Sequence, residues 1–180
     1  IDDKTNPVSV YGASKLAGEQ EIAAYHPANS AIVRTSWVYS SHGNNFVKTM
    51  LRLMKEKEEL SVVSDQIGCP TYAKGLAQFL WQLAQQQEVK ALYHWSDLGV
   101  ASWYDFAVAI QDEAYKLRVL DKKIPIKPIP SNAYPTPAKR PTFSLMQTTA
   151  ETELTMANLN YWRESLVRCL KALRNTEIFN

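Results

Sequence analysis

The chain has 180 residues and a formal net charge of +2, with 46% hydrophobic and 21% charged residues. These values are typical of a soluble globular protein that can bury a core in one or two small domains. The small net charge gives no reason to expect nucleic acid or a membrane surface as a partner, and no apolar run approaches the ~20 residues of a transmembrane helix.

The first predicted element is a helix over residues 10–25, which Ser9 can cap and which ends at His26 because a proline follows. Tyr11 and Lys15 are four residues apart, so they share one face of this helix. An ammonium beside a phenol favours the phenolate, and such a pair suits general acid–base work on an alcohol or carbonyl oxygen. The alternative is a half-buried tyrosine and a solvated lysine, since this spacing alone is a weak motif. The helix is also expected to bury an apolar face, comprising Leu16, Ala17, Ile22 and Ala23.

A short, buried parallel strand is predicted within residues 31–36. Ligands in open α/β sheets bind beyond the carboxyl ends of the strands, so the segment from Trp37 to Tyr39 leaves this strand at the binding edge. A core indole is the alternative for Trp37. Arg34 stands beside buried apolar residues and needs a partner that the sequence does not identify.

The next two polar segments are candidate binding loops. Asn44 and Asn45 stand where an amphipathic helix begins, and free backbone N–H groups at a helix N-terminus favour anions. A strand over residues 60–63 leads into the loop 64–71, which contains a glycine and is stiffened by a proline, as binding loops often are. The alternative for this loop is a capped turn in which Thr71 is the N-cap.

The rest of the chain alternates predicted helices and strands. These are a helix over 73–87 with Leu76, Phe79, Leu80 and Leu83 inward, a strand over 91–95, a helix capped by Ser102 with Trp103, Phe106, Ala107 and Ile110 on one face, an edge strand within 124–130, and a helix over 161–173 with Trp162, Leu166, Leu170 and Leu173 as its packing stripe. His26 and His94 are assigned no chemistry.

Prolines stiffen an irregular loop over residues 131–141, which presents Lys139 and Arg140. A loop stiffened in this way loses little entropy when it binds an anion, and a guanidinium can bond phosphate in bidentate fashion. The alternative for Arg140 is a solvated surface cation.

Several ordered segments resemble one enzyme family. They are Thr5-Asn6-Pro7-Val8-Ser9-Val10-Tyr11-Gly12-Ala13-Ser14-Lys15-Leu16-Ala17-Gly18-Glu19, Arg34-Thr35-Ser36-Trp37-Val38-Tyr39, Gly43-Asn44-Asn45-Phe46-Val47, Asp65-Gln66 with Gly68-Cys69-Pro70-Thr71, and Ala133-Tyr134-Pro135-Thr136-Pro137-Ala138-Lys139-Arg140-Pro141. The first closely resembles the active-site helix of the extended short-chain dehydrogenase/reductases that act on nucleotide sugars. Within that group the chain looks most like the dTDP-4-dehydrorhamnose reductase family, whose order of motifs it keeps over residues 1 to 145.

The resemblance implies an enzyme that reduces the C4 ketone of a nucleotide sugar, dTDP-4-dehydro-L-rhamnose, to dTDP-L-rhamnose with hydride from NADPH or NADH. Tyr11 would protonate the C4 oxygen, and Lys15 would stabilise the phenolate and bond the nicotinamide ribose. The implied cofactor-binding residues are Tyr11, Lys15, Thr35, Ser36 and Val38, and the implied substrate-binding residues are Trp37, Asn44, Asn45, Gln66, Thr71 and Arg140. No metal ligand is implied. The family's third catalytic group, a serine or threonine, is expected before residue 1.

The predicted fold is α/β: the C-terminal part of a Rossmann-like doubly wound parallel sheet plus a smaller α/β substrate-binding domain. Residues 1–40 and 70–90 are assigned to the first part, and residues 41–69 and 91–180 to the second. The six glycines are not spaced as G-x-G-x-x-G, so the glycine-rich half that cradles a dinucleotide pyrophosphate is expected elsewhere in a longer protein. Cys69 and Cys169 lack C-x-x-C spacing, which disfavours a zinc site or disulfide framework and favours the reducing cytoplasm.

Two other functions stay open. One is an epimerase or dehydratase of another nucleotide sugar, which uses the same Tyr–Lys pair. The other is a non-catalytic regulatory subunit of the methionine adenosyltransferase type, which the intact Tyr11–Lys15 pair disfavours. The expected partner is the nucleotide-sugar substrate, with no nucleic acid or membrane, and a homodimer remains open.

Overall fold

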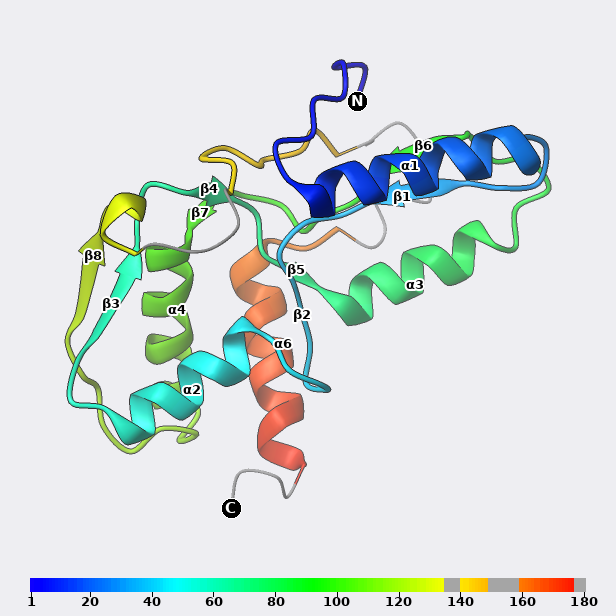
Figure 1. Ribbon diagram of the computed structural model, residues 1–180. Coiled ribbons are helices and arrows are strands. Elements are labelled where there is room, and N and C mark those ends of the chain that lie inside the picture. The colour runs from blue at the N-terminus through cyan, green and yellow to red at the C-terminus, as the bar shows by residue number, and fades with distance from the viewer. Residues whose placement is uncertain (135–139, 149–158, 177–180) are drawn as a thin grey trace.

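The computed structural model describes residues 1–134, 140–148 and 159–176 (Figure 1). In chain order the elements are α1 (Val10–Tyr25), β1 (Ile32–Arg34), β2 (Val38–Tyr39), α2 (Phe46–Glu56), β3 (Leu60–Val63), β4 (Ile67–Gly68), β5 (Thr71–Tyr72), α3 (Ala73–Leu83), β6 (Leu92–His94), β7 (Ala101–Ser102), α4 (Trp103–Lys116), β8 (Ile126–Ile129), the 3-10 turn η1 (Ser131–Ala133) and α6 (Trp162–Asn175). Residues 135–139 of the predicted proline-rich loop, Lys139 among them, lie outside the described residues.

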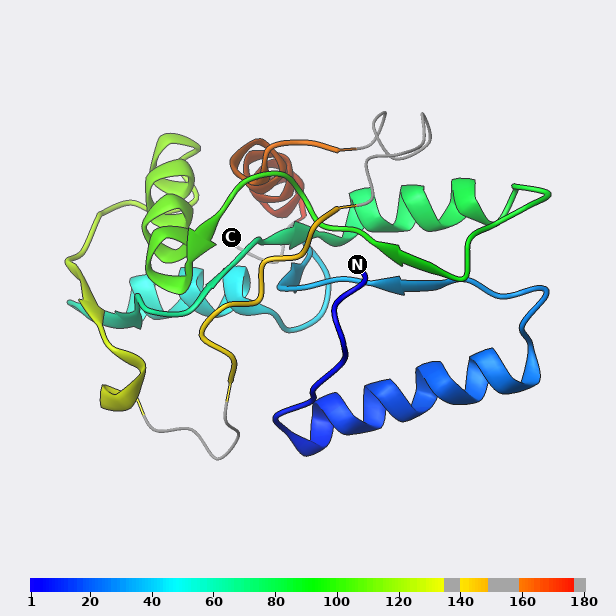
Figure 2. The same cartoon turned by 90° about the horizontal axis from the view of Figure 1, so that it is seen from above.

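The predicted α/β class is confirmed. Within the described residues the strands pair two by two: β1 with β6, β2 with β5 and β3 with β8 in parallel, and β4 with β7 antiparallel. Seen from above, α1 and α3 lie on opposite sides of the β1–β6 pair (Figure 2). This layering, helix on sheet on helix, is that of a doubly wound fold.

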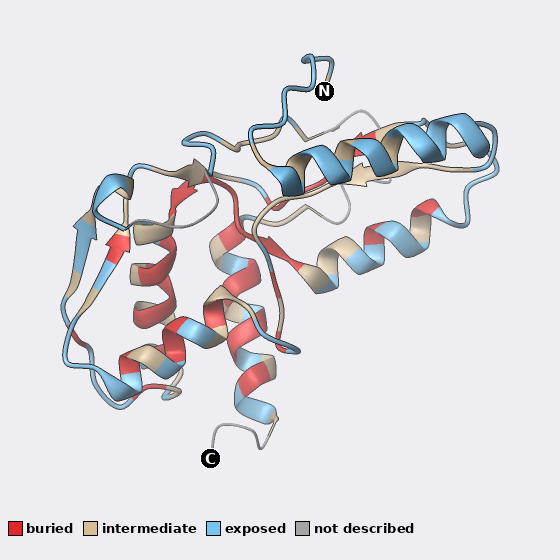
Figure 3. Cartoon of the chain, in the orientation of Figure 1, coloured by how far each residue is buried: buried red, intermediate tan, exposed pale blue. Residues whose placement is uncertain are grey.

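The larger hydrophobic core lies among α2, α4 and α6, where the buried residues concentrate (Figure 3). Ser102 caps α4, as predicted, and forms a capping box with Asp105. Phe106 and Ile110 of α4 are fully buried against Leu166 and Leu170 of α6. The helical spacing of these residues therefore predicted the correct faces.

A second, smaller cluster joins α3 to the β1–β6 pair. It contains Phe79, Leu83, Tyr93 and Trp95. Two details of the α3 prediction were wrong: the helix ends at Leu83 rather than at residue 87, and Leu80 is 43% exposed. Phe79 and Leu83, one helical turn apart, already fill the face that meets the strands, so Leu80 lies beside the contact.

The predicted apolar face of α1 is not buried. Both ends of α1 are as predicted: Ser9 accepts a hydrogen bond from Gly12 N at 3.1 Å, and His26 is the C-cap. However, α1 contains no buried residue. Its firmest described tie to the sheet is a bidentate ion pair in which Arg34 donates to Glu19, with Nε–Oε1 at 2.8 Å and Nη2–Oε2 at 2.6 Å. This pair identifies the partner that Arg34 needed.

The predicted division into two domains stays a prediction. One feature bears on its boundaries: β6, at residues 92–94, pairs with β1, although residues 91–180 were assigned to the other part. No helix within the described ranges is long and apolar enough to cross a membrane.

Candidate active site

Tyr11 and Lys15 lie in the first two turns of α1. The phenol of Tyr11 is 71% exposed, and Lys15 Nζ lies 5.4 Å from the centroid of its ring, within cation–π range. Both views place the start of α1 on the side where β1 ends (Figures 1 and 2). The pair is therefore exposed at the carboxyl edge of a parallel strand, where open α/β sheets bind ligands.

The segment after β1 makes a sharp turn at Trp37. This residue has φ +48°, a left-handed backbone conformation that residues other than glycine rarely adopt. Its indole stacks on that of Trp103 at 3.7 Å between centroids and 9° between planes. A residue held in such a conformation is a candidate functional position, because the surroundings must hold it there.

The structure brings the 35–38 segment together with the loop that ends at Thr71. Val38 pairs with Thr71 in the β2–β5 ladder, and Thr71 N donates to Trp37 O at 3.1 Å. Ser36 Oγ donates to Cys69 O at 3.3 Å. Two sequence segments that were separately predicted to bind ligand are thus joined by backbone pairing.

Two hydroxyls in this region have no hydrogen-bond partner among the described residues. Thr35 Oγ1 and Thr71 Oγ1 are both buried and unpaired within the described part of the chain. Buried polar atoms are normally satisfied, so two unsatisfied hydroxyls next to each other's segments single out this region as a candidate site. The alternative role of Thr71 as a helix cap is wrong, because Tyr72 holds that position at α3.

The predicted asparagines differ in their surroundings. Asn45 is the N-cap of α2: its Oδ1 accepts from Lys48 N at 3.3 Å, and its Nδ2 donates to Ser40 O at 2.8 Å. Asn44 is exposed. The side chain of Asn45 therefore builds the loop, and only the neighbouring exposed groups are free to meet an anion.

Gln66 and Arg140 come from neighbouring segments. Residues 142–144 run alongside Ile67, whose N donates to Thr142 O and whose O accepts from Ser144 N, both at 2.8 Å. Gln66 is half-buried next to this pairing, and Arg140 is exposed two residues before it. Arg140 forms no ion pair with any described residue, so its guanidinium could bind an anionic ligand without breaking an existing pair.

Asp97 is a buried carboxyl that the sequence reasoning missed. It is 2% exposed, its Oδ2 accepts from Tyr72 N at 3.0 Å, and its backbone O accepts from Cys69 Sγ at 2.8 Å. Burial raises the pKa of Asp97 to about 6, against the opposing hydrogen bonds from Tyr72 and Ser165. Its position just after a predicted strand, at the ligand-binding edge, was the signal that could have singled it out.

The two cysteines are structural. Both are free and buried, and burial raises the pKa of each thiol to about 12, which disfavours a reactive thiolate. His94 Nδ1 lies 3.2 Å from Gln147 O, and burial lowers the pKa of its ring. Among the described residues, no group of three or more His, Cys, Asp and Glu side chains is placed to hold a metal ion.

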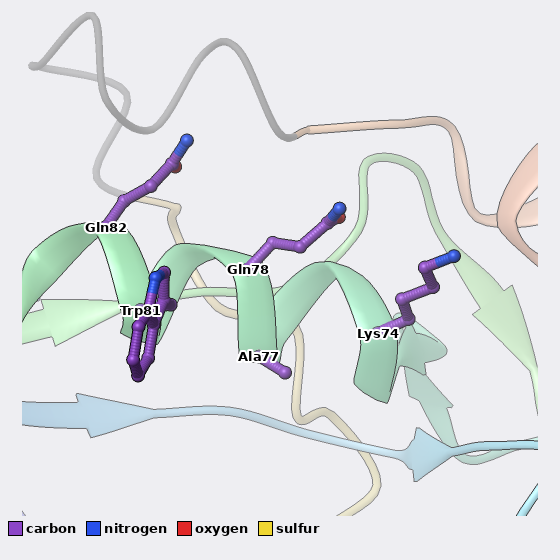
Figure 4. Close-up of a pocket in the computed structure, with 5 residues that line it drawn as sticks. All are labelled: Lys74, Ala77, Gln78, Trp81 and Gln82. Atoms are coloured by element: carbon purple, nitrogen blue, oxygen red, sulfur yellow. The ribbon is translucent and has the colours of Figure 1, made fainter.

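A surface hollow of about 350 Å³ lies apart from these residues (Figure 4). Its lining comes entirely from α3: Lys74, Ala77, Gln78, Trp81 and Gln82. No predicted site residue contributes to it, and a hollow lined by one helix offers little enclosure for a ligand.

Comparison with known proteins identifies related chains. Residues 1–175 match the family described as RmlD substrate binding domain. The chain is 41% identical over 178 residues to the dTDP-4-dehydrorhamnose reductase of Escherichia coli (strain K12), covering 97% of this chain and 59% of that protein. The chain thus spans about three-fifths of the length of this relative.

Two crystal structures share this architecture. The dTDP-4-dehydrorhamnose reductase of Bacillus anthracis, solved in complex with NADP, superposes with a TM-score of 0.82 at 38% identity, covering 95% of this chain and 58% of that one. The corresponding protein of Clostridium acetobutylicum superposes with a TM-score of 0.84 at 38% identity, covering 96% and 59%.

Proposed function

The chain belongs to the RmlD substrate binding domain family, and from this membership we propose that it supplies the proton donor and the sugar-binding part of an NAD(P)H-dependent reductase. The reaction is reduction of dTDP-4-dehydro-L-rhamnose to dTDP-L-rhamnose. The observation that carries the proposal is the exposed Tyr11–Lys15 pair at the carboxyl edge of β1, in a chain 41% identical to a protein named for this activity. Because the chain spans 59% of that protein, the activity is proposed for a full-length protein that contains it.

Tyr11 is the proposed general acid. As the C4 carbonyl carbon is reduced, negative charge develops on its oxygen, and the phenol of Tyr11 donates a proton to that oxygen. Lys15, one turn along the same face, stabilises the phenolate that remains. The exposure of Tyr11, at 71%, supports this role, since most of its side chain is open to a ligand.

The residues present fit the nicotinamide side of a cofactor site. Thr35 Oγ1 is buried and has no hydrogen-bond partner among the described residues, and Val38, three residues later, is 44% exposed, so this segment offers one unsatisfied hydroxyl and one apolar contact. Ser36, bonded to Cys69 O, fixes the backbone between them. Bound NADPH or NADH supplies the hydride. NADP is present in the Bacillus anthracis relative, which supports the phosphorylated form.

The substrate is proposed to lie between the 66–71 loop and the segment after β1. Trp37 offers an aromatic surface to the sugar, and Gln66 and Thr71 offer polar groups. Arg140 and the exposed Asn44 next to the N-terminus of α2 are the candidates for the diphosphate, since both provide donors suited to an anion, while Asn45 shapes that N-terminus as its cap. The free thiols of Cys69 and Cys169 support a cytoplasmic location.

Tyr11→Phe in the full-length protein tests the proposal. The phenylalanine keeps the ring and loses only the proton, so we expect kcat to fall by about 10²–10⁴-fold while the affinity for the nucleotide sugar changes little. The measurement is steady-state oxidation of NADPH with the 4-keto sugar. Tyr25→Phe is the matched control, because Tyr25 lies on the same helix and is 74% exposed.

Turnover of Tyr11→Phe within about threefold of the parent would remove Tyr11 from the mechanism. Binding of the nucleotide sugar with no reduction by the parent protein would favour a non-catalytic role instead.

A further inference from the structure

Resting on the proposed contact between Trp37 and the sugar, we propose that Trp103 and Gly68 are positioning residues that set the orientation of the Trp37 indole. Neither residue is assigned a contact with substrate or cofactor. They would act on the reaction only through Trp37, because the orientation of its indole would determine how tightly and in which pose the sugar binds.

The backbone at Trp37 does not hold its own conformation. Left-handed φ values cost a bulky residue of order 1–3 kcal/mol, and they persist only where surrounding contacts impose them. Thr71 N binds Trp37 O and so fixes the peptide, but that bond leaves the side chain undetermined. The direction of the indole must come from what the ring itself touches.

Trp103 provides the first of those contacts. The two indoles are nearly parallel at 9° with centroids 3.7 Å apart, and Phe46 packs on Trp103 in turn at 4.7 Å. Stacked aromatic pairs add ~0.5–1.5 kcal/mol beyond their buried area and select an orientation. Trp103 therefore acts as a flat support, itself backed by the start of α2.

Gly68 provides the second contact by lacking a side chain. A Cβ on Gly68 would lie 2.7 Å from Cε2 and 2.9 Å from Cζ2 of Trp37, and 2.8 Å from Ser144 Oγ. Such distances force something to move. The backbone of Gly68 is buried and its conformation needs no glycine, so the close approach of the indole, together with that of Ser144 Oγ, is what requires one.

Both supports belong to one unit of structure. Gly68 pairs with Ala101 in the β4–β7 ladder, and Trp103 follows two residues later as the first residue of α4. The capping box between Ser102 and Asp105 fixes where that helix begins. The β4–β7 pair thus carries the two groups that meet the indole, while β1 delivers Trp37 from the other side.

Far-UV circular dichroism of the ligand-free full-length protein tests the stack independently of function. Two parallel indoles at this distance couple their transitions, so Trp37→Phe and Trp103→Phe should each remove the same band. Trp81→Phe is the matched control, because Trp81 is 72% exposed on α3 and should leave the band intact. A band that survives Trp37→Phe or Trp103→Phe would overturn the inference.

Kinetics tests the consequence. Trp103→Leu and Gly68→Ala should each lower kcat/KM for the nucleotide sugar by about 10- to 100-fold, mainly through KM, because the ring that meets the sugar is misplaced. Affinity for NADPH should stay within about twofold, and Trp103→Phe, which keeps a ring on the stack, should stay within about threefold of the parent. In a Trp37→Phe background, Trp103→Leu should add no further loss.

The outcomes separate the two proposals. Unchanged kcat/KM in Trp37→Phe would overturn the proposed sugar contact of Trp37, and the inference with it. Loss in Trp37→Phe without loss in Gly68→Ala would overturn the positioning inference alone. If Trp103→Leu does not fold, an impaired Gly68→Ala variant together with an active Trp103→Phe variant still supports the positioning inference. An equal loss of NADPH affinity in Gly68→Ala and Trp103→Phe would overturn it.

Discussion

Asp97 connects three segments of the candidate site through a single residue. Its carboxylate accepts from Tyr72 N at the start of α3, its backbone O accepts from Cys69 Sγ, and Ser165 of α6 reaches its side chain. A carboxyl buried to this degree is costly to ionise, and the pKa of Asp97 rises from 3.8 to about 6 for that reason. Its charge state therefore affects the stability of the fold next to Thr71.

The sign of this effect follows from the raised pKa. Below about pH 4 the carboxyl is protonated in both folded and unfolded chains, and its full contribution to stability is present. Between pH 4 and 6 the unfolded carboxyl ionises while the folded one retains its proton, so the contribution falls with rising pH. The difference in pKa corresponds to ~3 kcal/mol. The paired carboxyls of Glu19 and Asp112 have lowered pKa values and act in the opposite direction.

Asp97→Asn should remove this loss of folding stability with rising pH, because the amide keeps an acceptor for Tyr72 N but has no titratable proton. Urea unfolding of the full-length protein between pH 4 and pH 7 measures the free energy of unfolding. We expect the variant to gain on the parent by up to ~3 kcal/mol as the pH rises. Asp121→Asn, at an exposed position, should follow the parent at every pH. Parallel curves for Asp97→Asn and the parent would contradict the assignment.

Among the elements, α1 carries the proposed proton donor yet has no buried residue to hold it to the rest of the molecule. The Glu19–Arg34 pair spans from the middle of α1 to the end of β1. The two side chains are 21% and 26% exposed, so the pair is partly shielded from solvent. The hydrogen bonds from Arg34 lower the pKa of Glu19, which indicates that the pair favours the charged form.

Glu19→Gln should loosen α1 without unfolding the rest. The glutamine keeps one acceptor but loses the charge, and we expect the free energy of opening of α1 to fall by about 1 kcal/mol. Amide hydrogen exchange of residues 10–25 measures it, with the α4 amides as internal reference. Glu21→Gln is the matched control, being exposed on the same helix. Equal protection in Glu19→Gln and Glu21→Gln would show that the ion pair does not hold the helix.

The sequence predicted elements best where the signal is local. Ser102 caps α4 at the predicted position, α2 begins after Asn45 where a helix was predicted to begin, and the helical spacing of Phe106 and Ile110 identified the correct buried face. Local chemistry determines a cap, because the side chain bonds a backbone N–H only a few residues away. The same holds for α1, whose boundaries were right.

What the sequence did not predict depends on distant partners. The exposed apolar face of α1, the pairing of Arg34 with Glu19 and the stack of Trp37 on Trp103 each join residues whose proximity the fold decides. Trp103 was assigned to the packing face of α4, and its spacing held no sign of a second role. Periodicity identifies a buried face and does not identify which side chain meets it.

At the scale of the whole molecule, the β1–β6 pair has few neighbours among the described residues. It is two-stranded, so β1 presents an unpaired edge there, and α1 beside it exposes Val10, Tyr11, Ile22 and Tyr25. Unpaired strand edges and exposed apolar side chains are where further chains attach. The related reductases are longer than this chain, which covers 58–59% of the two crystal structures.

Residues 1–180 expressed alone should therefore self-associate and show no reductase activity. The chain has Tyr11 and Lys15, but its six glycines include no G-x-G-x-x-G spacing to receive a pyrophosphate. Hydride transfer needs the donor and acceptor carbons held at roughly 3–3.5 Å, which part of a cofactor site cannot provide. Light scattering of the isolated chain, and its NADPH oxidation with the 4-keto sugar beside that of the full-length protein, measure both expectations. A monomeric fragment with measurable turnover would mean that these 180 residues hold a complete cofactor site, and the division of labour proposed for the longer protein would be wrong.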